Sequence, residues 1–159
     1  MVARSGDGFI RCSDGHVRWG IFGAAGAVFM HVTEPGRRPE VLLQLRSAFS
    51  HEGGTWSCPG GAIDAGETPL QAALREAAEE VGAVPAGHQF VGEYVFAPAV
   101  EWSYTTAVVQ VPERFGTVVN FETAAIEWVA VDDVAHRPLH AGFRAAWPHL
   151  HTIVTTTPD

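Results

Sequence analysis

Apolar residues occur in short runs along the chain, and the length of these runs predicts strands rather than long helices. Segments 8–12 and 17–22 are expected to pair as a hairpin around an Asp14-Gly15 turn. Segments 33–39 and 47–61 are rich in proline or glycine and are predicted to be a turn and a loop. Further strands are expected at 24–32, 41–46, 91–96, 104–111 and 126–131.

A helix is predicted over residues 69–81, because the residues at both of its ends have the right local chemistry. Thr68 is a good N-cap, Pro69 suits the first helical position, and Gln71 completes a capping box with Thr68. Gly82 suits the position just past the last helical residue. The two ends of this helix are therefore fixed by sequence alone.

A closing helix is expected over residues 143–153, where apolar side chains recur at helical spacing. The 159 residues contain no linker, repeat or low-complexity segment, so we expect one domain spanning 1–159. Strands and helices are mixed, which predicts the α/β (α+β) class, with helices packed on the faces of a sheet.

The helix at 69–81 separates into an apolar and an acidic face at about 100° per residue. Glu76, Glu79 and Glu80 share the acidic face, although like charges three and four residues apart repel each other. A solvated acidic face is one interpretation; a site for Mg²⁺ (or Mn²⁺) is the other, because hard cations take clustered oxygen ligands. The apolar face is predicted to consist of Leu70, Ala73, Leu74, Ala77, Ala78 and Val81.

The segment from 61 to 83 holds glycines and charged residues at the spacing GX5EX7REUXEEXGU. The positions concerned are Gly61, Glu67, Arg75, Glu76, Glu79, Glu80 and Gly82. This pattern resembles the signature of Nudix hydrolases and departs from it only at the aliphatic positions, filled here by Ala77 and Ala83. The resemblance implies the Nudix αβα sandwich with a central mixed β-sheet. Largely outside the signature, three segments look like bacterial MutT-type members, which remove oxidised guanine nucleotides such as 8-oxo-dGTP: GGTW…PGGA at 53–62, WSYTT at 102–106 and FETAAIEWVAVDDV at 121–134.

The resemblance also implies roles for the residues of this segment. Glu76, Glu79 and Glu80 match the metal-binding glutamates of the family, and the carbonyl of Gly61 often adds a ligand. Arg75 matches the arginine that orients a glutamate of the signature. Glu79 is assigned as the general base, although members of the family differ in which glutamate has this role.

Three residues outside the signature are further candidates for the site. Arg46, at the end of its strand, resembles a phosphate-contacting arginine. Glu122 resembles a downstream metal-binding or base glutamate of MutT-type proteins. Asn120 could bind a purine edge through its amide, or could be an ordinary turn residue. Three strand aromatics could stack on a base or belong to the core: Trp56, Phe96 and Trp102.

The net charge of −8 disfavours a nucleic-acid polymer as partner, because proteins that bind its backbone carry a basic surface. A small nucleotide substrate is compatible with this charge if a cation supplies the positive charge. All ten basic residues are arginines, which excludes a P-loop lysine and Schiff-base chemistry. Residues 1–8 lack a signal pattern and the apolar run 21–30 is too short for a bilayer, so we expect a cytoplasmic protein with no membrane contact.

Three functions are compatible with the sequence. The leading hypothesis is a MutT-type hydrolase that converts a purine nucleoside triphosphate, oxidised or ordinary, to the monophosphate and pyrophosphate. Pro98 lies fifteen residues after Ala83, a spacing that resembles the ADP-ribose pyrophosphatase branch, so ADP-ribose or a nucleoside diphosphate sugar is the second. The third is a non-catalytic nucleotide-binding module. Dimers are common in the family, so a homodimer is possible.

Overall fold

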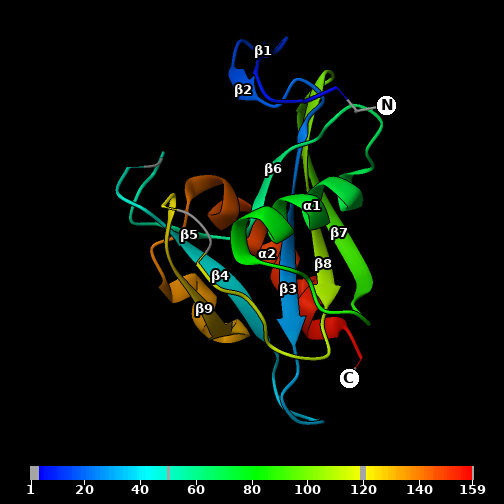
Figure 1. The fold of residues 1–159 in the computed structure, drawn as a ribbon, viewed down its shortest axis with the longest axis vertical. Coiled ribbons are helices and arrows are strands. Elements are labelled where there is room, and N and C mark those ends of the chain that lie inside the picture. Colours follow the sequence, from blue (N-terminus) through cyan, green and yellow to red (C-terminus); the bar gives the residue numbers. More distant parts are fainter. Residues whose placement is uncertain (1–3, 50, 119–120, 159) are drawn as a thin grey trace.

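A computed structural model describes residues 4–49, 51–118 and 121–158. Figure 1 shows a central sheet with helix α1 on one face and helix α2 on the other. None of the described helices has both the length and the apolar character needed to cross a membrane. The elements in chain order are β1 (Phe9–Arg11), β2 (Val17–Trp19), β3 (Ala24–His31), β4 (Glu40–Arg46), β5 (Trp56–Ser57), β6 (Gly60–Ala62), α1 (Pro69–Val81), β7 (Gln89–Ala99), β8 (Trp102–Gln110), β9 (Thr123–Ala130), the 3-10 helix η1 (Val131–His136) and α2 (Ala141–Thr156).

The main sheet has seven strands and is mixed. Its central path runs β5-β4-β3-β8-β7, with β6 also pairing to β3 and β9 to β4. Strands β3 and β8 are parallel, and every other pairing is antiparallel. The fold is therefore the αβα sandwich around a mixed sheet that the sequence predicts.

Strands β3 and β4 separate soon after they meet, and this separation creates the space for a site. Among the described residues, their pairing is limited to Met30 with Val41 and His31 with Glu40. Beyond that point β3 pairs with β6 and the same edge of β4 pairs with β5, while β9 pairs along the whole of β4 on its other edge. The segment that holds β5 and β6 therefore lies between the separated strands, in a region that the sequence predicts as a loop.

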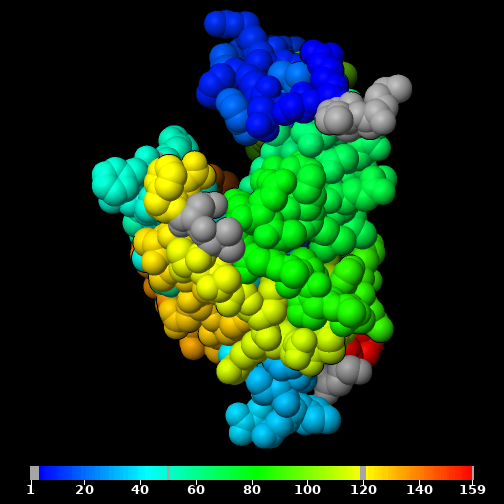
Figure 2. All heavy atoms as spheres, viewed as in Figure 1, coloured from blue at the N-terminus to red at the C-terminus, as the bar shows by residue number. Residues whose placement is uncertain are grey.

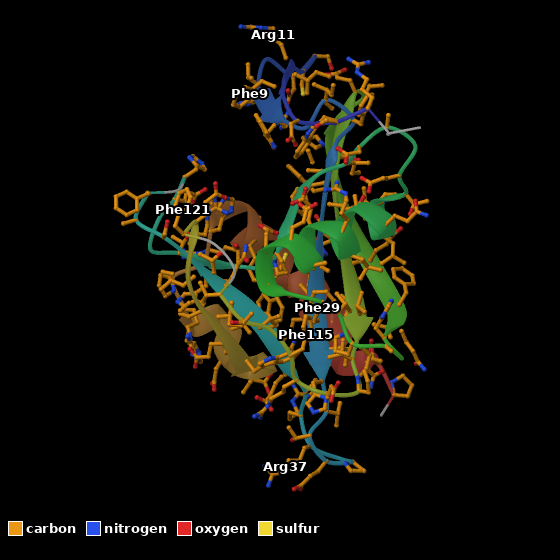
Figure 3. The ribbon with its side chains drawn as sticks, in the orientation of Figure 1. Phe9, Arg11, Phe29, Arg37, Phe115 and Phe121 are labelled. Carbon is orange, nitrogen blue, oxygen red and sulfur yellow. The ribbon has the colours of Figure 1, made fainter. Side chains whose placement is uncertain are left out.

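Two buried clusters fill the layers between the sheet and the two helices. One packs α2 and η1 against β3, β4 and β8, and includes Trp147 and Leu150. The other packs α1 against the opposite face and includes Phe29, which contacts Phe115 edge-on with ring centroids 5.0 Å apart (Figure 3). The predicted closing helix is confirmed, and its apolar side chains face the core.

The hairpin β1–β2 is a separate two-stranded sheet, and its position above the main sheet is clear in Figure 1. Its register pairs Phe9 with Trp19 and Arg11 with Val17. The predicted hairpin is thus confirmed, with shorter strands than expected. Both cysteines, Cys12 and Cys58, are buried and free, as their number suggests.

Candidate active site

Helix α1 begins and ends as its local chemistry predicts. The Thr68 hydroxyl accepts a hydrogen bond from the Gln71 amide at 3.1 Å, and the Gln71 side chain accepts one from the Thr68 amide at 2.9 Å. Gly82 ends the helix with a φ of 102°, a conformation that favours glycine. One detail of the predicted faces is wrong: Ala78 is exposed and Ala72 is buried. The helix packs against β3, β6 and β8, and these contacts set its rotation.

Arg75 is the centre of an ion-pair network that fixes the acidic face. Its Nε and Nη2 donate to the two carboxylate oxygens of Glu67 at 2.8 and 2.9 Å. Its Nη1 donates to Glu76 at 2.9 Å and lies 3.5 Å from Glu79. Its Nη2 also reaches the carbonyl of Ala62 at 3.0 Å. The planar guanidinium therefore holds the helix carboxylates in place, as expected for the orienting arginine.

Glu76 and Glu80 both reach the short strand β6, which follows the turn into the signature segment. Glu80 Oε2 accepts a hydrogen bond from the Gly60 amide at 2.9 Å. Gly61 lies so close to Glu76 that a Cβ there would be 2.5 Å from the Glu76 carboxyl carbon. Any side chain at position 61 would consequently displace the carboxylate. The structure brings Gly61, Glu76 and Glu80 together, as predicted.

Burial changes the acidity of these two carboxylates. Burial raises the pKa of Glu80 to about 8 and raises the pKa of Glu76 above its ordinary value, against the opposing effect of Arg75. Each pKa is raised further by the negative charge of a neighbouring glutamate: Glu76 for Glu80 and Glu79 for Glu76. Two half-buried carboxylates of this kind are stabilised in their ionised forms by a cation between or beside them. The donor set therefore fits a hard divalent cation.

Glu79 differs from its two neighbours. Its side chain is 59% exposed, whereas that of Glu76 is 16% exposed. Arg75 Nη1 approaches its carboxylate at 3.5 Å. A carboxylate in this position is accessible to water and to a substrate at the surface of the helix.

A cleft of about 840 Å³ lies beside the Gly60–Ala62 strand. Figure 2 shows the surface hollowed between the N-terminal hairpin and the loop at residues 47–55. Such a volume is typical of small-molecule sites. Residues that line it include Phe9, Trp19, Gln44, Arg46, Ser57, Gly60, Gly61, Phe96, Trp102, Tyr104, His140 and Phe143.

Arg46 lines this cleft, and its positive charge lowers the pKa of Glu80. Its Nε donates to the carbonyl of His51 at 2.6 Å, which anchors the guanidinium to the segment after β4. The carbonyl of Glu122 accepts a hydrogen bond from the Ser47 amide at 2.8 Å, which places the Glu122 backbone next to the end of β4. Asn120 lies outside the residues that the structure describes. The roles of all three residues stay predictions.

Gln44 and Ser57 are polar residues of the cleft that the sequence analysis missed. They are direct partners across β4 and β5, and their side chains are 4% and 7% exposed. Gln44 Oε1 and Ser57 Oγ have no hydrogen-bond partner among the described protein atoms. Buried polar atoms without partners are rare, and both residues line the cleft. The sequence contains no signal for these two site residues, because a glutamine and a serine at strand positions are ordinary until the structure shows that they are buried.

His51, Glu52 and His140 form a second cluster, with one ligand-capable atom each within 4.8 Å of the others. His140 Nδ1 accepts from the Gly142 amide at 3.1 Å, so in the neutral ring Nε2 carries the proton and faces Glu52 Oε2 at 2.9 Å. Glu52 Oε1 accepts from the Ala141 amide at 3.0 Å. Glu52 and His140 thus act as a cap of α2.

The aromatic residues that were candidates for base stacking have different environments. Phe96 is 45% exposed and lines the cleft together with Trp102. Trp56 is partly buried against the α2 side of the core, and the Arg137 guanidinium lies 4.9 Å from its ring centroid. Pro98 lies in the edge strand β7, where the register shifts between Phe96 and Ala99. A proline is well tolerated at such an irregularity.

Comparisons with known proteins agree with this geometry. The NUDIX domain model matches residues 23–150. The chain is 42% identical over 163 residues to a Mycobacterium tuberculosis protein named "Putative 8-oxo-dGTP diphosphatase 3", covering 99% of this chain and 75% of that protein. It is 32% identical over 106 residues to the CTP pyrophosphohydrolase of Escherichia coli, covering 65% and 76%. The crystal structure of a Nudix hydrolase from M. smegmatis, RenU, superposes with a TM-score of 0.81 at 41% identity, covering 97% and 98%. Helix α1 carries the glutamates and the arginine of the signature, and the cleft adjoins this helix. The chain belongs to the Nudix hydrolase family.

Proposed function

We propose that this enzyme hydrolyses a purine nucleoside triphosphate, such as 8-oxo-dGTP, to the nucleoside monophosphate and pyrophosphate. Nudix hydrolases act on small nucleotide substrates and generally use divalent metals. Relatives named 8-oxo-dGTP diphosphatase support this choice of substrate. The observation that carries the proposal is the Arg75-ordered carboxylate face of α1 beside a cleft large enough for a nucleotide.

In this proposal Glu76, Glu80 and the Gly61 carbonyl hold Mg²⁺ (or Mn²⁺), with Glu79 at the exposed edge of the set. When bound, such a cation would neutralise phosphate charge and would lower the pKa of the attacking water. Phosphoryl transfer depends mainly on such positioning and charge neutralisation, so no nucleophilic side chain is required.

The protein residues have separate tasks in this proposal. Glu79 accepts the proton of the attacking water, because its carboxylate is the exposed one of the three. Arg75 keeps Glu67 and Glu76 in fixed positions. Arg46, at the rim of the cleft, contacts the substrate phosphates, and Glu122 assists from the same side.

Substrate and product identity test this proposal directly. Purified protein is incubated with Mg²⁺ and 8-oxo-dGTP, dGTP, the other deoxynucleoside triphosphates, ADP-ribose or a diadenosine polyphosphate, with EDTA as control. The highest kcat/KM is expected for 8-oxo-dGTP or dGTP, with release of pyrophosphate. AMP release from ADP-ribose as the best reaction would replace this substrate assignment with the second hypothesis. Nucleotide binding without metal-dependent turnover would indicate a non-catalytic module.

A further inference from the structure

The hairpin β1–β2 presents an apolar face to the cleft. Phe9 and Trp19 are cross-strand partners with ring centroids 5.0 Å apart, and their exposed fractions are 70% and 46%. Val17, two residues before Trp19 and on the same face, is 54% exposed. All three line the cleft. Exposed apolar side chains gathered on one face indicate a binding surface.

This hairpin is held firmly to the rest of the domain, so its aromatic face has a fixed position. The Trp102 indole N–H donates to the Trp19 carbonyl at 3.1 Å. The Gly6 amide donates to Asp64 at 2.8 Å, and the Ala65 amide donates to the Arg4 carbonyl at 2.8 Å. Figure 3 shows Phe9 on the hairpin, far from the core pair of Phe29 and Phe115. Phe9 is therefore placed by the fold without being used in the core.

A continuous series of contacts connects this face with the helix carboxylates. Glu80 binds the Gly60 amide, and a Cβ on Gly60 would meet the Tyr104 hydroxyl at 2.5 Å. The ring centroids of Tyr104 and Trp102 are 6.4 Å apart, and Trp102 binds Trp19. The carboxylates and the aromatic face are thus two ends of one cleft.

Charge differs between these two ends. Arg18, the charged residue of the hairpin that lines the cleft, forms two hydrogen bonds to Asp14 at 2.9 and 2.7 Å. Its guanidinium also lies 5.3 Å from the ring centroid of Trp102. Arg46 lies at the other end, near Glu80. Phosphates are therefore better accommodated at the carboxylate end with its cation, and an uncharged planar group at the hairpin end.

We propose that an aromatic wall binds the nucleobase of the substrate. The wall consists of Phe9 and Trp19 of the hairpin, Phe96 of β7 and Trp102 of β8. This inference rests on the proposed function and deepens it, because it assigns base binding to two hairpin residues before the matched segment 23–150, together with two residues inside that segment. Bases stack on aromatic side chains with little dependence on sequence. The buried pair Gln44 and Ser57 supplies polar atoms to the same cleft, nearer the carboxylates.

The test compares ligands that differ only by the base. Binding of dGMP, 8-oxo-dGMP and 2-deoxyribose 5-phosphate is measured by calorimetry in Mg²⁺. The wild-type protein should bind the nucleotides more tightly than the sugar phosphate. Trp19→Ala should weaken nucleotide binding about tenfold and leave sugar phosphate binding within twofold. Trp19→Phe should restore most of the loss, because it keeps an aromatic face. In turnover assays Trp19→Ala should raise KM far more than it lowers kcat.

Phe49→Ala is the matched control for Phe9→Ala, because Phe49 is 93% exposed but does not line the cleft. Phe9→Ala should weaken nucleotide binding and Phe49→Ala should not. Equal binding by wild type and Trp19→Ala, or wild-type affinity for sugar phosphate equal to that for nucleotides, would overturn the proposal. A further contradicting outcome would be a Trp19→Ala variant that changes from dimer to monomer in size-exclusion chromatography but keeps its nucleotide affinity. That result would show that the aromatic face binds a second copy of the chain.

The same measurements separate this inference from the proposed function. Trp19-dependent binding of dGMP without hydrolysis of any triphosphate would contradict the proposed function and keep the aromatic wall. Triphosphate hydrolysis together with nucleotide binding that is independent of Trp19 and Phe9 would keep the proposed function and contradict the aromatic wall. If Trp19→Ala does not fold, Trp19→Leu and Phe9→Leu, which keep apolar volume but remove the ring, provide the comparison.

Discussion

Helix α1 and the β1–β2 hairpin adjoin the same cleft, but different forces hold their side chains in place. On α1, Arg75 makes charged contacts to Glu67 and Glu76, and burial shields Glu76 and Glu80 from water. On the hairpin, Phe9 is largely exposed, and its ring contact within the part of the chain that the structure describes is with Trp19. The helix is therefore organised before any ligand binds, whereas the hairpin leaves apolar area that a ligand can cover.

Removing a helix carboxylate should have the largest effect on catalysis. Glu79→Gln is expected to lower kcat by about 10³-fold, the usual loss when a general base is removed. EDTA should abolish turnover of the wild-type enzyme. Glu93→Gln, which changes an exposed strand glutamate, is the control, with kcat close to wild type. Retention of most of the turnover by Glu79→Gln would show that another residue is the base.

Weakening the ion-pair network tests whether the helix face is organised in advance. Arg75→Lys should lower kcat/KM by about 10²-fold, because one ammonium group cannot replace the bidentate contact to Glu67 and the contact to Glu76. The free energy of unfolding should fall by about 2 kcal/mol. This loss is smaller than for a fully buried ion pair, because the Arg75 side chain is 30% exposed. Urea denaturation measures this. Arg37→Lys, at an exposed pair with Glu34, should change neither quantity.

Glu67 gives the network a predictable pH dependence. The hydrogen bonds from Arg75 lower the pKa of Glu67 below its ordinary value of 4.5. A folded-state pKa below the unfolded value means that Glu67 stabilises the fold above pH 4.5 and that this stability is lost as the pH falls through the folded pKa. Glu67→Gln should therefore lower Tm at pH 7, and the difference from wild type should shrink towards pH 3. If the difference in Tm does not depend on pH, the stabilisation does not come from the ionised Glu67 carboxylate.

The smallest effect is expected for the stability of the hairpin variants. Phe9→Ala should change the free energy of unfolding by less than about 0.5 kcal/mol, because the side chain is 70% exposed. The same variant should weaken nucleotide binding, so stability and binding are separated at one residue. Urea denaturation beside Phe49→Ala provides the comparison. A loss above about 1 kcal/mol would show that Phe9 is needed for packing rather than for a ligand.

The local features of the fold could be predicted with good accuracy. The α1 limits, Pro69 and Val81, agree with the structure because Thr68, Gln71 and Gly82 act within a few residues of the helix ends. The rotation of the helix was predicted less well: Ala72 is buried in place of Ala78. Rotation depends on contacts with strands that are distant in sequence, so periodicity alone gives it only approximately.

The three glutamates of the acidic site could also be predicted from the sequence. The differences in their exposure and in the direction of their side chains could not. Glu76, Glu79 and Glu80 are equivalent on a helical projection. In the structure Glu76 and Glu80 turn towards β6 and Glu79 remains exposed. The β5 and β6 strands that produce this difference lie in a segment predicted as a loop, because strands of two and three residues rely on pairing rather than on their own composition.

The sequence by itself determined the family, the caps of α1, the strands at the centre of the sheet and the carboxylate set, because each depends on neighbours within a few positions or on a fixed spacing. Only the tertiary structure decided which carboxylates are buried, that Gln44 and Ser57 become buried polar partners, and that Phe9 and Trp19 adjoin the cleft. These properties depend on the separation of β3 from β4 and on the docking of the hairpin. Both are contacts between distant segments, and the burial they create is not encoded in any local pattern.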